Sequence, residues 1–377
     1  MRILLWAEGF WPNIGGGPQF SADLAVALRD RGHEMFVITR HDDPTVPAAD
    51  MFHGIPVRRF PFRQVLASRN IDELARLRRD VIDAKRLAAP ELVHTTSFGP
   101  SMLFQADTAR AHPAPLLVTL LGEENPTQNA SETTLHRALQ TADWVTAPSE
   151  ATLGYARKLM PSCSDRSCVI HIGAHRPPIT PAPYPHDPVL LCIGRLVQIK
   201  GYDLAIDALP RILKEFPSIR LTIAGDGPER ASLERQACEL GVESAVDFLG
   251  WVSPGDIPAL INAASAVLIP SRAEAFPLAG IQAAFMERPV IGTHVGGIPE
   301  LVIDGETGLL VESRNSSLLA EAVLRLVNHP QEQAKFGQAA RNRALRLLDY
   351  DRMIDRYEDL YQRIISAWDP PQPKAIR

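Results

Sequence analysis

Several common signals of location and ligand are missing from this sequence. No stretch approaches the ~20 consecutive apolar residues of a membrane span. The short apolar run at the start is interrupted by Glu8, before the core of a signal peptide would be complete. The 4 cysteines are not spaced as paired metal ligands, which favours reduced thiols. We therefore predict a cytoplasmic protein without a transmembrane segment.

The sequence also lacks a strong charge of either sign and a dinucleotide-binding fingerprint. Its net charge is -5 and its pI is about 6.1, which gives no global electrostatic reason to expect nucleic-acid binding. A first strand and helix are expected at residues 2–7 and 20–31, and the loop between them has no G-x-G-x-x-G pattern. That loop holds Gly15, Gly16 and Gly17, whose bare backbone could lie against a phosphate or a sugar. A flexible surface loop is the alternative.

What the sequence does have is enough apolar material for two domains. Its 377 residues are 45% hydrophobic and 22% charged, which can fill two cores under a polar surface. Short apolar runs alternate with amphipathic helical patterns in both halves, which predicts an α/β fold with two doubly wound parallel sheets. The proline-rich residues 177–185 predict a stiff linker that acts as a hinge. We place the domains at residues 1–178 and 186–348, with a final helical segment at 349–377.

Two loops of the second half carry the residues that we expect to form a ligand site. Arg195 and Lys200 follow a strand predicted at residues 189–193, and Glu274 follows a second apolar strand, just before a helix that should begin at Pro277. Open α/β sheets bind ligands at the carboxyl ends of their strands, and the N–H groups at a helix start attract anions. Two cations beside such a helix predict a diphosphate site that needs no metal.

Polar residues of the first half are candidates for binding a second substrate. His94 ends a predicted strand, and Glu123 and Glu124 lie in the turn after another, so all three could contact acceptor hydroxyls. A satisfied core histidine and a solvated loop are the alternatives. The arginine-rich residues 58–69 favour an acidic acceptor, a membrane surface or simply a solvated face.

The second half also contains a series of short motifs in a definite order. They are Gly194-Arg195-Leu196 with Lys200-Gly201, Ala224-Gly225-Asp226-Gly227-Pro228, Gly250-Trp251-Val252, Pro270-Ser271 with Glu274-Ala275-Phe276-Pro277-Leu278, and Gly296-Gly297-Ile298-Pro299-Glu300 with Gly305-Glu306-Thr307-Gly308-Leu309. In order and spacing they resemble the nucleotide-sugar domain of glycosyltransferase family 4. The first half resembles the same family less specifically, through residues 15–17, 31–34 and 148–150.

The resemblance implies a GT-B fold, in which two Rossmann-like domains face each other across a cleft that holds the active site. It implies a retaining, metal-independent transfer of a hexose from a nucleotide sugar, with a UDP-sugar favoured and no cofactor. The acceptor, bound by the first domain, would be a small molecule, a glycan or a lipid-linked sugar, so peripheral contact with the inner membrane face stays open. The final helix would cross back to the first domain.

Carried over residue by residue, the family's catalytic roles fall on Glu274, Arg195 and Lys200. The two cations would stabilise the leaving diphosphate as its charge grows, and Glu274 would accept hydrogen bonds from hydroxyls of the donor sugar. The resemblance also assigns donor binding to Gly16, Gly17, Phe276, Pro277, Leu278 and Gln282.

Three positions depart from the family pattern. Gln282 stands where the family has a second glutamate, and a neutral amide binds a ribose hydroxyl more weakly than a carboxylate. Leu121 replaces a frequent histidine, and residues 171–175 replace a turn that usually carries asparagine and aspartate. These departures leave two alternatives to an active transferase, namely a nucleotide-sugar-binding homologue without catalysis and a GT-B epimerase or phosphorylase.

Overall fold

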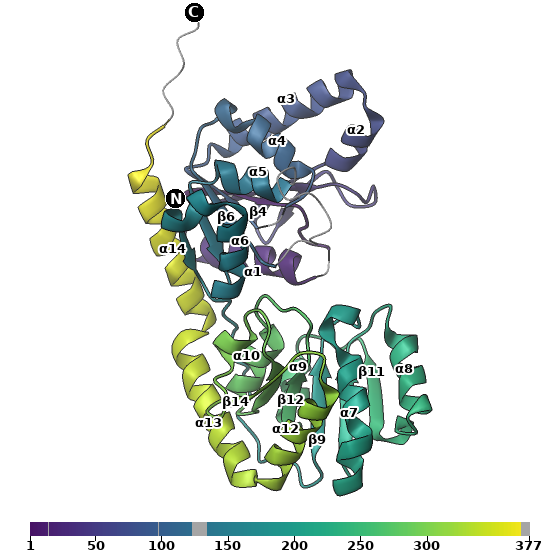
Figure 1. Ribbon diagram of the computed structural model, residues 1–377. Helices are drawn as coiled ribbons and strands as arrows, with labels where there is room; N and C mark the ends of the chain where they lie inside the picture. The colour runs from purple at the N-terminus through teal and green to yellow at the C-terminus, as the bar shows by residue number, and fades with distance from the viewer. Residues whose placement is uncertain (14, 97, 123–133, 371–377) are drawn as a thin grey trace, which may run out of the picture. The chain divides into compact units, whose positions relative to one another are not determined.

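The computed structural model describes residues 1–13, 15–96, 98–122 and 134–370, and it divides into two compact units (Figure 1). Unit 1 comprises Met1–Ile170 and Ile354–Arg377, and unit 2 comprises His171–Met353. The division therefore falls before the proline-rich residues 177–185, which belong to unit 2.

Within its described residues, unit 1 is built on an eight-stranded sheet in the order β3-β4-β2-β1-β5-β6-β7-β8. The pair β3 and β4 is antiparallel and the other pairs are parallel. Its strands are β1 (Arg2–Ala7), β2 (Glu34–Arg40), β3 (Ala49–Phe52), β4 (Ile55–Phe60), β5 (Leu92–Thr95), β6 (Leu116–Thr119), β7 (Trp144–Ala147) and β8 (Ser167–Val169). Its helices are α1 (Gly16–Asp30), α2 (Phe62–Ser68), α3 (Ile71–Ala88), α4 (Ser101–Asp107), α5 (Thr134–Thr141), α6 (Glu150–Leu159) and, from Ile354 onward, α14 (Tyr350–Ala367).

The apolar stripe of α14 is buried. Its inward residues, all at most 6% exposed, are Met353, Tyr357, Leu360, Tyr361 and Ile364. Polar contacts hold the same helix in unit 1, because Arg31 pairs with both Asp355 and Glu358. A long amphipathic helix of this kind is stabilised mainly by burying its apolar face.

Unit 2 contains a parallel sheet of six strands, counted over its described residues, in the order β11-β10-β9-β12-β13-β14. The strands are β9 (Val189–Ile193), β10 (Arg220–Ala224), β11 (Val246–Gly250), β12 (Ala266–Ile269), β13 (Val290–Thr293) and β14 (Gly308–Val311). The helices are α7 (Tyr202–Glu215), α8 (Arg230–Glu239), α9 (Ile257–Asn262), α10 (Leu278–Phe285), α11 (Ile298–Leu301), α12 (Ser316–Asn328) and α13 (Pro330–Leu347). The order reverses between β9 and β12, so their carboxyl ends form the switch point at which such sheets bind ligands.

The proline-rich residues 177–185, which we predicted to be a stiff linker acting as a hinge, lie within unit 2 and pack against it. Arg288, only 1% exposed, donates hydrogen bonds to the carbonyl oxygens of Ala182 (2.7 Å) and Asn262 (2.6 Å). Its guanidinium also lies over the ring of Tyr184, 4.6 Å from the centroid. The Ala182 N–H donates in turn to Asn262 Oδ1 at 2.8 Å. A buried arginine thus fixes this segment to the body of unit 2.

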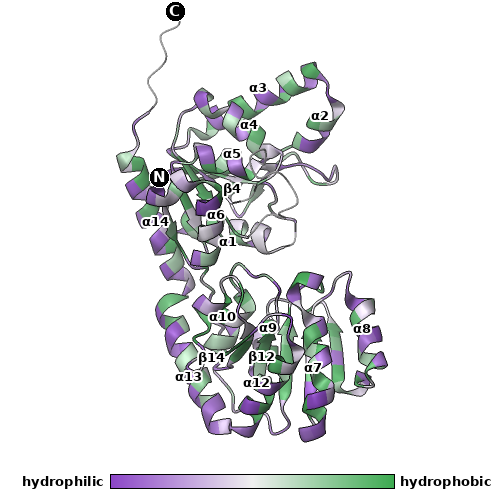
Figure 2. Cartoon of the chain, in the orientation of Figure 1, coloured by the Kyte–Doolittle hydropathy of each residue, from purple (hydrophilic) through white to green (hydrophobic). Residues whose placement is uncertain are grey.

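The helices of both units carry hydrophobic and hydrophilic residues side by side, as amphipathic helices do (Figure 2). None of the helices in the described ranges is long and apolar enough to cross a membrane.

Candidate active site

Two loops leave the same edge of the unit 2 sheet and form the candidate site. Strands β9 and β12 are parallel neighbours, with Leu190 paired to Ala266 and Leu191 to Val267. Residues 194–201 follow β9 and residues 270–277 follow β12. They approach so closely that a Cβ atom on Gly201, at φ +67°, would lie 2.0 Å from the Pro270 carbonyl oxygen. Only a glycine allows this contact, because both the space and the backbone conformation exclude a side chain.

Lys200 and Glu274 meet across these loops. The Lys200 ammonium lies 2.6 Å from Glu274 Oε2, and the hydroxyl of Ser271 donates to the same oxygen at 3.3 Å. The side chains are 30% and 11% exposed, so the carboxylate is mostly enclosed while the ammonium still reaches solvent. Two of the three residues to which we assigned catalytic roles are therefore in direct contact.

Arg195, the third, lies in the same loop as Lys200 but is exposed. Its side chain makes no hydrogen bond or ion pair with any other residue in the described part of the chain. The next residue, Leu196, is 0% exposed and anchors the loop in the core. The guanidinium is accordingly available to an anion from solvent.

The residues after Glu274 lead into α10, which begins one residue later than we predicted. Pro277 occupies the position before the helix, with φ -85° and ψ 105°, and Leu278 is the first helical residue. Leu278 is 42% exposed, Gln282 is half-buried, and Phe276 is 4% exposed. Because the first N–H groups of a helix have no partner within it, this end of α10 offers donors to an anion.

Glu274 is held from behind by the turn that precedes α11. The Gly297 N–H donates to the Glu274 carbonyl oxygen at 2.9 Å, and a Cβ atom on Gly296 would lie 1.8 Å from that oxygen. Thr293 donates through its hydroxyl to the Ser271 carbonyl at 2.5 Å. The glycines of the Gly296-Gly297 motif therefore serve close backbone packing beneath the carboxylate.

A histidine that our sequence reasoning did not assign to the site also touches this loop. The ring of His171 stacks on Phe276, with centroids 5.1 Å apart and planes 19° from parallel. Its Nδ1 lies 3.9 Å from Glu300 Oε2. No spacing in the sequence indicates this contact, because residues 171 and 276 belong to distant segments.

In unit 1, the structure places the two candidate glycines at the start of α1. A Cβ atom on Gly16 would meet nothing within 4 Å, and one on Gly17 would lie 3.9 Å from Leu121. Neither glycine is required by close packing. Their assignment to donor binding stays a prediction.

His94 is not placed where an acceptor can reach it, which corrects our acceptor-side candidate. It is 0% exposed, and its two ring nitrogens lie 2.7 Å from the hydroxyls of Tyr361 and Thr119. Burial lowers the pKa of His94 to about 3, so the ring is neutral at physiological pH. It is a core residue that ties α14 to the sheet. The other acceptor-side candidates, Glu123 and Glu124, lie outside the described residues.

The arginines of residues 58–69 do not act together. Arg59 is 4% exposed and donates to the carbonyl oxygens of Pro47 (2.9 Å) and Trp11 (3.0 Å), so it is structural rather than part of a basic surface. Arg63 lies 3.6 Å from Glu8. Arg58 is exposed.

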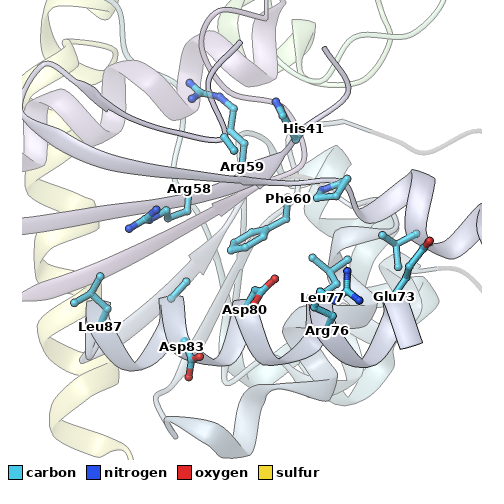
Figure 3. A pocket seen from close by; sticks show the side chains of 14 residues that line it. His41, Arg58, Arg59, Phe60, Glu73, Arg76, Leu77, Asp80, Asp83 and Leu87 are labelled. Atoms are coloured by element: carbon cyan, nitrogen blue, oxygen red, sulfur yellow. The ribbon is translucent and has the colours of Figure 1, made fainter. Parts of the chain in front are cut away.

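Unit 1 contains a hollow of about 690 Å³ between the outer strands of its sheet and α3 (Figure 3). Arg58 and Phe60 line it from β4, and Asp80, Asp83 and Leu87 line it from α3. None of the residues that we assigned to the site lines this hollow. Its charged walls and aromatic ring suit a polar ligand with an apolar face.

Across the described ranges, no three or more His, Cys, Asp or Glu side chains are grouped so as to hold a metal ion.

Comparisons with known proteins match both halves of the chain to glycosyltransferases. A family model described as glycosyl transferases group 1 matches residues 180–343, and one described as glycosyl transferase 4-like domain matches residues 15–173. A glycogen synthase of Mycobacterium tuberculosis (strain ATCC 25618 / H37Rv) is 27% identical over an alignment of 414 residues, gaps included, that covers 99% of this chain and 97% of that protein. A GDP-mannose-dependent alpha-(1-6)-phosphatidylinositol monomannoside mannosyltransferase of Mycolicibacterium smegmatis is 34% identical over 165 residues, or 42% of this chain and 43% of that protein.

Two solved structures resemble the chain over nearly its whole length. A sucrose-phosphate synthase from Thermosynechococcus elongatus has a TM-score of 0.80 at 22% identity, covering 98% of this chain and all (100%) of that one. Anabaena HepE in complex with UDP has a TM-score of 0.81 at 23% identity, covering 96% of this chain and 100% of that one. At these identities the likeness concerns the fold.

Proposed function

Because the chain belongs to glycosyltransferase family 4 and has the GT-B fold, we propose that it transfers a hexose from a nucleoside-diphosphate sugar to an acceptor hydroxyl. The family, the fold and glycosyl transfer as the class of reaction were all predicted from the sequence and are confirmed. Retention of configuration and independence from metal ions are part of the proposal.

The contact between Lys200 and Glu274 carries this proposal. The two groups neutralise each other at 2.6 Å. A bound nucleotide sugar offers both groups a better partner, because its diphosphate attracts the ammonium and its hydroxyls donate to the carboxylate. We therefore propose that the junction between the diphosphate and the sugar of the donor lies at this pair.

We propose a task for each group during transfer. The bond from the anomeric carbon to the diphosphate oxygen breaks with its electron pair left on the diphosphate, whose negative charge grows. Lys200, the exposed guanidinium of Arg195 and the N–H groups at the start of α10 stabilise that charge more in the transition state than in the bound donor. The acceptor oxygen forms the new bond to the anomeric carbon, and its proton passes to the departing diphosphate oxygen.

For the donor we propose a UDP-sugar. Its support is the set of Anabaena HepE structures in complex with UDP and with UDP-glucose. The mycobacterial relative described as GDP-mannose-dependent supports the competing choice of a GDP-sugar. The side chains that contact the nucleobase determine whether a UDP-sugar or a GDP-sugar binds.

For the acceptor we propose a hydroxyl of a small molecule, a glycan or a lipid-linked sugar, bound by unit 1. The hollow beside Arg58, with a volume of about 690 Å³ and charged walls, is one cavity of that unit that could hold such a group. Arg58→Ala should raise the KM for the acceptor and leave the KM for the donor unchanged. A cytoplasmic location and peripheral contact with a membrane remain predictions.

The decisive experiment measures release of nucleoside diphosphate from a panel of nucleotide sugars with candidate acceptors. Arg195→Ala and Glu274→Ala should each abolish it. Arg235→Ala is the matched control, since Arg235 is also an exposed arginine of unit 2 but lies on α8. Nucleotide binding without turnover for any pair would instead indicate a non-catalytic homologue. Turnover that requires inorganic phosphate, or that yields free sugar isomers, would indicate a phosphorylase or an epimerase.

A further inference from the structure

Arg272 connects the two loops of the candidate site. Its side chain donates to the Gln198 carbonyl oxygen at 2.6 Å and makes two parallel contacts with the Asp203 carboxylate, at 2.8 and 2.5 Å. Its backbone N–H donates to the Ile199 carbonyl oxygen at 2.7 Å. A single residue of the loop after β12 thus holds residues on both sides of Lys200.

The contact between Arg272 and Asp203 is more enclosed and has a more defined geometry than an ordinary surface ion pair. Arg272 is 20% exposed and Asp203 is 36% exposed, and Asp203 lies in the first turn of α7, so the guanidinium fixes the loop to a helix. A planar guanidinium matches a carboxylate through two bonds at once, which sets orientation as well as distance. Backbone hydrogen bonds hold the first part of the loop, because the Leu196 N–H donates to the Asp226 carbonyl at 2.9 Å and the Leu196 carbonyl accepts from the Glu229 N–H at 3.0 Å. Arg272 holds the part next to Lys200.

We propose that Arg272 is a positioning residue for the donor diphosphate, because its clamp on Gln198 and Asp203 sets the place from which Lys200 reaches Glu274 and the phosphates. The inference rests on the proposed function of this site. Arg272 itself is committed to Asp203, so its action on the donor passes through Lys200.

The proposal predicts an energetic coupling that a general effect on stability would not produce. If Arg272 acts by placing Lys200, its replacement should weaken nucleotide binding only while Lys200 is present. Residues that act through one another show non-additive effects, whereas independent contributions add.

Unit 2 also provides a matched control pair. Arg220 contacts both oxygens of Asp247, at 2.8 and 2.7 Å, and donates to the Ser244 carbonyl oxygen at 3.0 Å. In this pair, as in the Arg272 pair, the hydrogen bond to the aspartate raises the pKa of the arginine. Arg220 is the first residue of β10 and therefore lies at the opposite end of the strands from the two loops.

The experiment is calorimetric titration of the full chain with UDP, GDP and ADP, continued with the nucleotide that binds most tightly. Arg272→Lys should raise the Kd for that nucleotide about tenfold, which is the loss of affinity expected for one charge-assisted hydrogen bond. In a Lys200→Ala background, Arg272→Lys should change Kd less than twofold. Arg220→Lys should leave Kd unchanged. If Arg272→Lys does not fold, Asp203→Asn tests the same clamp from its other side.

The outcomes separate the inference from the function on which it rests. If Lys200→Ala weakens binding but Arg272→Lys binds like the unmodified protein, Arg272 is not a positioning residue. The same conclusion follows if Arg272→Lys costs as much without Lys200 as with it. If the unmodified protein binds none of the nucleotides, or Lys200→Ala binds as well as it does, the proposed donor site fails and the inference fails with it.

Discussion

Lys85 gives the structure's most direct quantitative prediction. It lies in α3 with 1% of its surface exposed, and its ammonium donates to the Thr108 carbonyl oxygen at 3.2 Å. Burial lowers the pKa of Lys85 from its ordinary 10.5 to about 8. The folded protein therefore bears the cost of an enclosed charge at neutral pH.

The pKa shift sets the size of the effect of Lys85→Met. At about 1.4 kcal/mol per pKa unit, the buried charge costs about 3 kcal/mol at pH 7. The lost hydrogen bond offsets about 1 kcal/mol of the gain, and the Thr108 carbonyl keeps a second donor, the Ala111 N–H at 3.0 Å. We expect the variant to be more stable than the unmodified protein by about 2 kcal/mol at pH 7.

The advantage should disappear as the pH rises. Between pH 8 and pH 10.5 the unfolded lysine binds its proton and the folded one does not, so the unmodified protein gains stability with rising pH. The variant lacks this gain, and other titrating groups cancel in the difference. Urea unfolding of the full chain measures this difference in stability at pH 7 and pH 10. It is followed by tryptophan fluorescence, to which Trp6, Trp11, Trp144 and Trp368 contribute from unit 1 and Trp251 from unit 2. An equal difference at both pH values, or a less stable variant at pH 7, would refute the reasoning.

Three further predictions concern the site and the core. Gly201→Ala should unfold at a clearly lower temperature than Gly305→Ala. Both glycines have φ near +70°, but a Cβ atom on residue 201 would meet the Pro270 carbonyl, whereas one on residue 305 would enter open space. Equal melting temperatures would contradict the close approach. Gln282→Glu should tighten nucleotide binding several-fold in calorimetry if the side chain accepts from a ribose hydroxyl, and an unchanged Kd would remove Gln282 from the donor site. Burial lowers the pKa of His94 to about 3, so between pH 6.5 and pH 3 this histidine binds a proton only in the unfolded chain, and the folded protein loses stability as the pH falls. In His94→Gln, the free energy of unfolding should therefore fall less steeply with decreasing pH. An identical slope would show that His94 titrates normally.

Much of unit 2 could be predicted from sequence because its strands are continuous apolar runs. Residues 189–193 were predicted as a strand and form β9. The rule that parallel strands share a carboxyl edge then placed Lys200 and Glu274 at the same edge of the sheet. Their contact at 2.6 Å agrees with that inference.

What the sequence could not reveal depends on contacts between distant segments. Arg272 next to the glutamate motif has the pattern of a solvated arginine, and only the fold brings Asp203 to it. The periodicity of its strand allows the side chain of His94 to be either buried or exposed. The side chain is buried because Tyr361, which is distant in sequence, packs against it. Short elements such as β3 and α2 were missed because they contain too few residues to show a period.

The buried guanidinium of Arg288 has a practical consequence for anyone who wishes to excise unit 2. Composition alone would suggest cutting the chain after Pro185 and discarding the prolines as spacer. Such a fragment would lose the Ala182 carbonyl and the Tyr184 ring, and would leave a positive charge under-solvated in its interior. An autonomous unit 2 has to keep its proline-rich leader.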